Sequence, residues 1–315
     1  MGRGSTRIVA EHQEATLPGK RKETLECLPA SPEKVSRTPD GPAADCGLAT
    51  MGDTAGVHEA AANEVTLLHF NDVYEVQSRV REPVGGVARF IEKLRQYPDA
   101  VTLFSGDALA PSLLSTVTKG EHMVKFLNMM NIRAACMGNH DFDFGVEHLR
   151  DWCLPESNFP WLLSNAWHTD SGELLAGGRR SLVIEHRGRR LGVMGLIEEE
   201  WLATLATLER DEVIYRDYVE VAKEIVAELH QQGVDCVIAL THMRKPNDRR
   251  LAEHVPELDL ILGGHDHEVY SEVVNGVPII KSGTDFRDLT RLSLVWGTDA
   301  TGTGPAQLGG TGTEG

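Results

Sequence analysis

Side chains that can bind metal ions follow several short apolar runs in this sequence. The runs VTLLHF, VTLF, AACM, VIAL and LDLIL precede, in order, Asp72, Asp107, Asn139 with His140, His242, and His265 with His267. Carboxylate, amide oxygen and imidazole without thiolate suit Zn, Mn, Fe or Co better than a structural zinc site. One central carboxylate can bridge two cations about 3.5–4 Å apart, the spacing found in two-metal phosphatases. These residue types therefore predict a centre for two divalent ions.

The elements that must position these side chains alternate between strands and helices. Apolar runs predict strands at 65–70, 101–104, 134–137, 234–240, 258–262 and 291–296, and helical spacing predicts helices at 86–97, 121–130 and 218–232. Hairpins are predicted at 181–196 and, around Asn275-Gly276, at 273–280. This order indicates a layered α/β domain with mixed sheets.

The position of the polar residues after the strands indicates that they belong to one site. A lone Asp after a strand is usually a turn residue, and a lone His there is usually solvated or part of the core. Five strand ends in succession with oxygen or nitrogen ligands are harder to explain by coincidence. In open α/β sheets, ligands bind beyond the carboxyl ends of the strands, so these side chains could converge although they are far apart in the sequence.

The composition sets the limits of the folded part. Residues 1–62 are rich in small, polar and charged residues with almost no aromatics, and we predict a disordered leader there. Residues 297–315 are rich in Gly and Thr and predict a flexible tail. The catalytic domain is then expected at 63–296. No run reaches the ~20 apolar residues of a membrane span, and no secretory signal is recognisable, so we expect no membrane span and a cytoplasmic protein.

The charge balance narrows the class of partner. The chain has 31 Lys and Arg against 47 Asp and Glu, a net charge of −16. This acidity argues against binding to nucleic acid or to anionic membranes. An anionic small molecule would need local positive charge, which bound metal ions could supply. The five cysteines have no regular spacing and predict neither a disulfide scaffold nor a thiolate zinc site. The sequence leaves the oligomeric state open.

Five segments together resemble a known superfamily. FNDVY, SGDALAPS, MGNHDFDFG, LTHMR and GGHDH resemble the calcineurin-like metallophosphoesterases, and most of all the catalytic domain of the 5′-nucleotidase family, which includes UDP-sugar hydrolases and 2′,3′-cyclic phosphodiesterases. The resemblance covers about Glu64 to Trp296. It implies a sandwich of mixed sheets flanked by helices, and hydrolysis of a phosphate ester, usually of a nucleotide, by a metal-activated water. The family's C-terminal nucleotide-binding domain has no counterpart in the sequence and is expected to be absent.

The resemblance also implies a role for each candidate residue. Asp107 would bridge the two ions, Asp72 and His267 would complete the first metal site, and Asn139, His242 and His265 would complete the second. His140 would act on the substrate phosphate, by stabilising developing charge or by protonating the leaving oxygen.

Asp143 would orient His140 as the second member of a dyad. A carboxylate beside that imidazole is physically reasonable, because a histidine near two cations otherwise resists protonation. The residues alone leave another reading of Asp143 open, as the N-cap of a helix beginning near Val146.

One departure from the family motif concerns Tyr74, which stands where the family usually has a histidine ligand. Tyr74 could pack, could hydrogen-bond a water on the metal, or could bind a ferric ion as phenolate, and the first ion is expected to be more weakly held. Arg244, two residues after His242, could offer a phosphate contact or could be an ordinary surface arginine.

The leading hypothesis is a 5′-nucleotidase-type phosphomonoesterase. The alternatives are a phosphodiesterase acting on cyclic nucleotides or nucleotide-sugars, and a metal-binding regulatory module with little turnover. A nuclease has precedent in the superfamily but fits poorly with the acidic charge.

Overall fold

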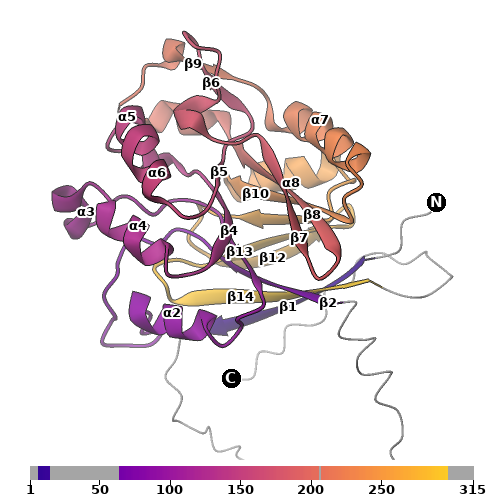
Figure 1. The fold of residues 1–315 in the computed structure, drawn as a ribbon, viewed down its shortest axis with the longest axis horizontal. Helices are drawn as coiled ribbons and strands as arrows, with labels where there is room; N and C mark the ends of the chain where they lie inside the picture. Colours follow the sequence, from indigo (N-terminus) through magenta and orange to yellow (C-terminus); the bar gives the residue numbers. More distant parts are fainter. Residues whose placement is uncertain (1–5, 15–63, 206, 297–315) are drawn as a thin grey trace, which may run out of the picture. The chain divides into compact units, whose positions relative to one another are not determined.

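Two mixed six-stranded sheets pack against each other at the centre of the fold (Figure 1). The computed structural model describes residues 6–14, 64–205 and 207–296, and all of these belong to one compact unit. The first sheet has the order β1 (Thr6–Glu14), β14 (Asp288–Trp296), β2 (Glu64–Phe70), β3 (Val101–Phe104), β4 (Ile132–Cys136) and β5 (Trp161–Leu162). The second sheet has the order β12 (Val269–Val274), β13 (Val277–Ser282), β11 (Leu260–Gly263), β10 (Cys236–His242), β8 (Arg189–Ile197) and β7 (Ser181–His186).

The strand directions place the loops that follow the strands. In the first sheet β2, β3, β4 and β5 run parallel, and β14 lies antiparallel to both β1 and β2. In the second sheet β8, β10, β11 and β13 run parallel, with β7 and β12 antiparallel at the edges. Parallel strands bring their carboxyl ends to the same edge of a sheet, which is where ligand sites form in α/β proteins.

The space between the two sheets is filled by the apolar side chains of their inner faces. The pairs Val65 and Leu67 from β2, Leu191 and Val193 from β8, and Ile238 and Leu240 from β10 belong to this one cluster. The intervening residues of the same strands face the outer helices, so both faces of these strands are buried. Burial on both faces explains why the parallel strands appear in the sequence as nearly continuous apolar runs.

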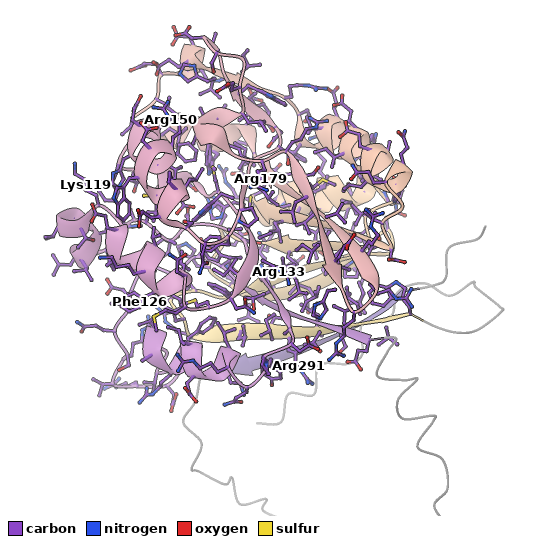
Figure 2. The ribbon with its side chains drawn as sticks, in the orientation of Figure 1. Lys119, Phe126, Arg133, Arg150, Arg179 and Arg291 are labelled. Carbon is purple, nitrogen blue, oxygen red and sulfur yellow. The ribbon has the colours of Figure 1, made fainter. Side chains whose placement is uncertain are left out.

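Helices lie outside the two sheets. They are α2 (Val87–Leu94), α3 (Leu113–Thr118), α4 (Glu121–Leu127), α5 (Val146–His148), α6 (Leu154–Glu156), α7 (Tyr218–Gln231) and α8 (Lys245–His254). All but α3 contribute apolar side chains that pack over the outer faces. The apolar stripe of α2, formed by Val87, Phe90, Ile91 and Leu94, packs on the outer face of the first sheet. Figure 2 shows side chains filling the space between the ribbons of the helices and the sheets.

The longest helix, α7, covers the second sheet together with α8. Its buried stripe includes Val221, Ile225 and Leu229. The helix begins after Asp217, whose side chain accepts hydrogen bonds from the backbone N–H groups of Val219 and Glu220. This cap satisfies backbone donors that have no partner inside the helix.

Short elements complete the described part of the chain. They are the two-stranded pair β6 (Ala166–His168) and β9 (Val213–Tyr215), the 3-10 turns η1 (Asn139–Phe142), η3 (Leu175–Gly177), η4 (Glu199–Thr204) and η5 (Arg210–Glu212), and the π-turn η2 (Leu149–Cys153). Within the described ranges no helix has both the length and the apolar character needed to cross a bilayer.

The predicted layered α/β sandwich is confirmed, together with its hairpins and its long helix. One part of the predicted domain plan is wrong: Thr6–Glu14 lies in the region expected to be a disordered leader, yet it forms β1 and pairs with β14 along its whole length. Ile8 is only 2% exposed and packs in the core between the sheets. The average composition of residues 1–62 concealed one short strand that covers the edge of β14. The rest of the predicted leader and the predicted tail lie outside the described residues.

Candidate active site

The loops after the parallel strands bring the predicted site residues to one place. The loops after β2 and β3 are joined directly, because the N–H of Asp72 donates to Gly106 O at 2.9 Å and the N–H of Val73 donates to Asp107 O at 2.8 Å. In the second sheet His242 is the last residue of β10, and His265 follows the neighbouring β11. Side chains from both sheets therefore meet at one end of the sandwich.

The distances between these side chains are those of a metal centre. Asp107 Oδ2 lies 3.1 Å from His242 Nε2, and Asp72 Oδ1 lies 3.1 Å from His267 Nε2. His265 Nδ1 lies 3.3 Å from His242 Nε2. One ligand atom from each of Asp107, His242 and His265 lies within 4.8 Å of the other two. The residues can thus share cations, with Asp107 between the two groups of ligands.

Asn139 supplies a further observation that points to a cation. Its side chain is buried, and among the described residues its Oδ1 has no hydrogen-bond partner. A buried acceptor without a partner is costly. The N–H of the next residue, His140, donates to Asp107 Oδ1 at 2.8 Å, which places this loop against the Asp107 carboxylate. A metal ion would satisfy the amide oxygen, so the donor set fits the ions that its chemistry predicts.

The backbone is held in an uncommon conformation at most of the predicted ligands. Asp72, Asp107, His265 and His267 have φ values of 53°, 61°, 79° and 57°, in the left-handed region. Non-glycine residues seldom adopt this left-handed conformation. It persists only where the surrounding structure enforces it, and this is often the case at functional sites. Here the N–H of His265 donates to Asp72 Oδ2 at 2.8 Å, so one ligand loop fixes the other.

Gly138 is required because the backbone approaches Asp107 very closely. A Cβ at this position would lie 2.1 Å from Asp107 Oδ1, which no side chain could tolerate. The glycine of the GNHD segment therefore leaves room for the carboxylate.

Asp141 is a supporting residue that the sequence analysis missed. Its fully buried carboxylate accepts hydrogen bonds from the backbone N–H groups of Gly138, Asp107, Ala108 and Leu109, at 2.8, 3.1, 2.9 and 3.2 Å. These bonds hold the loop that carries Asp107. In the sequence, Asp141 looked like part of the GNHDFD motif without a role of its own.

The electrostatics of the centre favour bound positive charge. Burial alone would lower the pKa of His242, but the carboxylates of Asp107 and Asp72 raise it to about 10. The N–H at His242 Nδ1 donates to Ser105 O at 2.8 Å, which directs Nε2 toward the carboxylates. Anchoring one ring nitrogen to a carbonyl is the usual way in which proteins orient a histidine ligand. The two buried carboxylates that raise this pKa would also attract bound cations.

His140 and Asp143 form the predicted pair. His140 Nδ1 lies 2.9 Å from Asp143 Oδ2, and the two side chains are 38% and 32% exposed, so His140 can be reached from solvent. The hydrogen bond that His140 donates to Asp143 raises the pKa of His140, although burial opposes the shift. The alternative reading of Asp143 as a helix cap is not supported, because the N-cap of α5 is Gly145.

Tyr74 directs its hydroxyl into the first group of ligands. The oxygen lies 3.0 Å from both Asp72 Oδ1 and Asp107 Oδ2, and 2.9 Å from His267 Nε2. Burial and the two carboxylates raise the pKa of this phenol. Tyr74 is therefore more than a packing residue: its protonated hydroxyl binds the ligands themselves.

Two more buried charged groups support the ligand loops, and neither was expected. Lys281 Nζ contacts Asp248 and Asp266, at 2.7 and 2.8 Å, and donates to the carbonyls of Met243 and Gly264, at 2.7 and 2.6 Å. These carbonyls adjoin His242 and His265. The second group, Glu198, follows β8 and is fully buried, with Oε1 3.8 Å from His265 Nε2. In a sequence, such charges resemble surface residues, since nothing local marks their burial.

Comparison with known proteins agrees with this geometry. The family model described as calcineurin-like phosphoesterase matches residues 65–269. The 5′-nucleotidase of Mus musculus is 30% identical over 230 residues, and that of Diplobatis ommata is 31% identical over 225 residues; each match covers 66% of this chain and 38% of the relative. The chain thus spans about two fifths of the length of these curated relatives.

The fold matches solved structures as well. The structure of a 5′-nucleotidase precursor from Thermus thermophilus superposes with a TM-score of 0.66 at 23% identity, covering 72% of this chain and 50% of that one. The family model spans every ligand candidate from Asp72 to His267, and the resemblance suggested by the motifs is confirmed. The chain belongs to the calcineurin-like phosphoesterases, a family that implies divalent metal ions.

Proposed function

We propose that this chain is a metal-dependent phosphoric ester hydrolase of the 5′-nucleotidase type that acts on phosphomonoesters. The observation that carries the proposal is the convergence, from two sheets, of carboxylate, amide and imidazole ligands on Asp107, with the His140–Asp143 pair beside them. The 5′-nucleotidase relatives support a nucleotide as the substrate.

The proposed metal sites are two. Asp72 and His267 would hold the first ion, Asn139, His242 and His265 would hold the second, and Asp107 would belong to both. Asp107 Oδ2 supports this role, since it lies 3.1 Å from His242 Nε2 and 3.0 Å from the Tyr74 hydroxyl that touches His267. When bound, Zn, Mn, Fe or Co ions would supply positive charge for the phosphate and acidify the attacking water.

The protein's own groups would handle the leaving oxygen. The hydrogen bond to Asp143 occupies His140 Nδ1 and leaves Nε2 for the substrate. Because Asp143 favours the protonated ring, the N–H at Nε2 could donate to a phosphate oxygen or pass a proton to the departing alkoxide. The partial exposure of His140 lets a substrate reach it, whereas Asp72, Asp107 and His242 are shielded from bulk water.

Hydrolysis assays test the proposal. Purified protein is reconstituted with each candidate metal and assayed on AMP, UMP, a cyclic nucleotide, a nucleotide-sugar and an aryl phosphate. We expect the monoesters to be hydrolysed fastest, and Asp107→Ala to lose bound metal and turnover together. Asp99→Asn serves as the control, because this exposed carboxylate pairs with Arg187 away from the ligands.

Other results would change the conclusion. Preferential cleavage of the cyclic nucleotide or the nucleotide-sugar would favour the phosphodiesterase alternative. Full metal loading without turnover on any substrate would favour a metal-binding regulatory module and would overturn the proposal.

A further inference from the structure

Arg244 occupies a position from which it could bind the substrate phosphate. It follows His242 by two residues, just beyond the end of β10 and at the start of α8. Its side chain is 45% exposed, and its Nε lies 2.8 Å from Oε1 of the fully buried Glu198. The same oxygen of Glu198 lies 3.8 Å from His265 Nε2. One carboxylate therefore stands between the guanidinium and a predicted metal ligand.

The guanidinium of Arg244 keeps its outer nitrogen atoms available. The ion pair with Glu198 is made through Nε, and within the described part of the chain neither Nη1 nor Nη2 donates a hydrogen bond. A planar guanidinium with two free amino groups binds phosphate oxygens in pairs. Arg249 is a contrast on the same helix, because its Nη1 is already paired with Glu272.

Glu198 has the contacts of a residue that fixes this geometry. Its Oε2 accepts hydrogen bonds from the backbone N–H of Arg244, at 2.7 Å, and from Asn247 Nδ2, at 2.6 Å. These two bonds already anchor the start of α8 without any help from the guanidinium. The pairing of Oε1 with the Arg244 side chain is thus an additional feature, and it ties the guanidinium to the carboxylate oxygen that lies 3.8 Å from His265 Nε2.

The negative charge around the site explains why a cationic side chain would be needed to bind a phosphate. Asp72, Asp107 and Glu198 are all buried at the centre, and the chain as a whole is acidic. A phosphate monoester brings up to two further negative charges, which desolvated carboxylates would repel. A fixed guanidinium just beyond the end of β10 would offset that repulsion.

We propose that Arg244 binds the phosphoryl group of the substrate and that Glu198 is the positioning residue that holds it there. The inference rests on the proposed function, because it places a phosphate ester at this metal centre. It goes beyond that function by assigning a phosphate-binding residue within this chain's own second sheet.

The binding of inorganic phosphate tests the proposal directly. Metal-loaded wild type, Arg244→Ala and Arg244→Lys are titrated with phosphate in a calorimeter, and the metal content of each sample is measured. Charge-assisted hydrogen bonds are worth about 1.5–3 kcal/mol, so Arg244→Ala should weaken phosphate binding by roughly 10- to 100-fold. Arg244→Lys keeps the charge beside Glu198 but loses the paired geometry, and should weaken binding by a smaller factor.

Two further variants distinguish the positioning of Arg244 by Glu198 from the general effect of a positive charge near the site. Arg249→Ala removes one positive charge from the same helix at similar exposure, 43% against 45%, and should leave phosphate binding unchanged. Glu198→Gln should weaken phosphate binding in the presence of Arg244 and have little further effect in the Arg244→Ala background, because a positioning residue acts through its partner. If Glu198 had only a structural role, Glu198→Gln would weaken phosphate binding by the same factor in both backgrounds.

The outcomes are distinct. The proposal is wrong if Arg244→Ala, at full metal content, binds phosphate as tightly as wild type. If Arg244→Ala loses metal, the same criterion applies to Arg244→Lys. If wild type binds phosphate through Arg244 but hydrolyses no ester, the proposed function fails, and only the part of the inference that assigns a phosphate-binding residue stands.

Discussion

The buried Lys281 network allows the consequence of a single substitution to be worked out. Lys281→Met removes the only positive charge from a cluster with two carboxylates, Asp248 and Asp266, and leaves two backbone carbonyls without their donor. Asp248 and the ammonium are fully buried, so water cannot replace the lost contacts. Removing one partner of a buried ion pair typically costs about 3–5 kcal/mol.

We therefore expect Lys281→Met to lower the free energy of unfolding by about 3–5 kcal/mol, a large part of the ~5–15 kcal/mol available to a typical domain. Urea unfolding of the metal-free protein, followed by tryptophan fluorescence, would measure the change. The metal affinity should fall as well, because the carbonyls that Lys281 holds adjoin His242 and His265.

A matched control and a compensating variant make the test specific. Lys245→Met removes a lysine whose side chain pairs with Glu268 near the surface, and should leave stability unchanged. Combining Lys281→Met with Asp248→Asn removes the stranded buried charge, and should recover at least about 1 kcal/mol of the loss. A loss under about 1 kcal/mol for Lys281→Met alone, with metal affinity intact, would show that the network does not support the ligand loops.

Three other predictions concern the site and the helix that flanks it. His140→Ala should keep its metal but reduce turnover by about 10²–10⁴-fold. Asp143→Asn should also keep its metal and reduce turnover by a smaller factor. Equal turnover of His140→Ala and wild type on every substrate would show that His140 has no part in the mechanism. Tyr74→His should bind metal more tightly, because imidazole replaces a phenol that keeps its proton. Competition with a chelator would measure the affinity. Unchanged metal affinity would refute the view that Tyr74 weakens the first site. The pKa of Asp217 is lowered: burial opposes the shift, but Arg250 and the backbone donors of α7 outweigh it. Its contribution to stability is therefore present above the ordinary carboxyl pKa of about 3.9 and lost as the pH falls through the lower folded value. Asp217→Asn should keep the helix cap and show a smaller loss of urea resistance below pH 4 than wild type, and identical acid profiles would contradict this assignment.

The sequence predicted the strands at the centre of the fold well because each of them can be recognised from its own residues. Strands buried on both faces are almost entirely apolar, as Val101–Phe104 and Cys236–Leu240 illustrate. The Asn275-Gly276 turn identified the hairpin of β12 and β13 for the same reason. The metal-ligand candidates could be identified because each one lies at the end of such a strand or in the loop that follows it.

The elements that were not predicted lack a local signal. Helix α8 begins Lys-Pro-Asn-Asp and buries only Asp248, Leu251 and Ala252, so no apolar stripe marks it. In α3 the large apolar residues Leu113 and Val117 are exposed, the reverse of an amphipathic pattern.

The supporting residues of the site were missed because their burial depends on distant parts of the chain. Asp141 meets backbone donors more than thirty positions away, and Lys281 meets Asp248 across the second sheet. Their roles follow from tertiary contacts that local spacing does not encode.

The division of the ligands between two sheets has a consequence for stability. Asp72, Asp107 and Asn139 come from the first sheet, and His242, His265 and His267 come from the second. Cations shared among them would join the two halves of the sandwich at one end, much as a cross-link would. An ion at 100 times its dissociation constant adds about 2.7 kcal/mol to the folded state. Chelation should therefore loosen the end where the sheets meet at the site. The opposite end, where Arg187 of the second sheet pairs with Asp99 before β3, should keep its protection from hydrogen exchange.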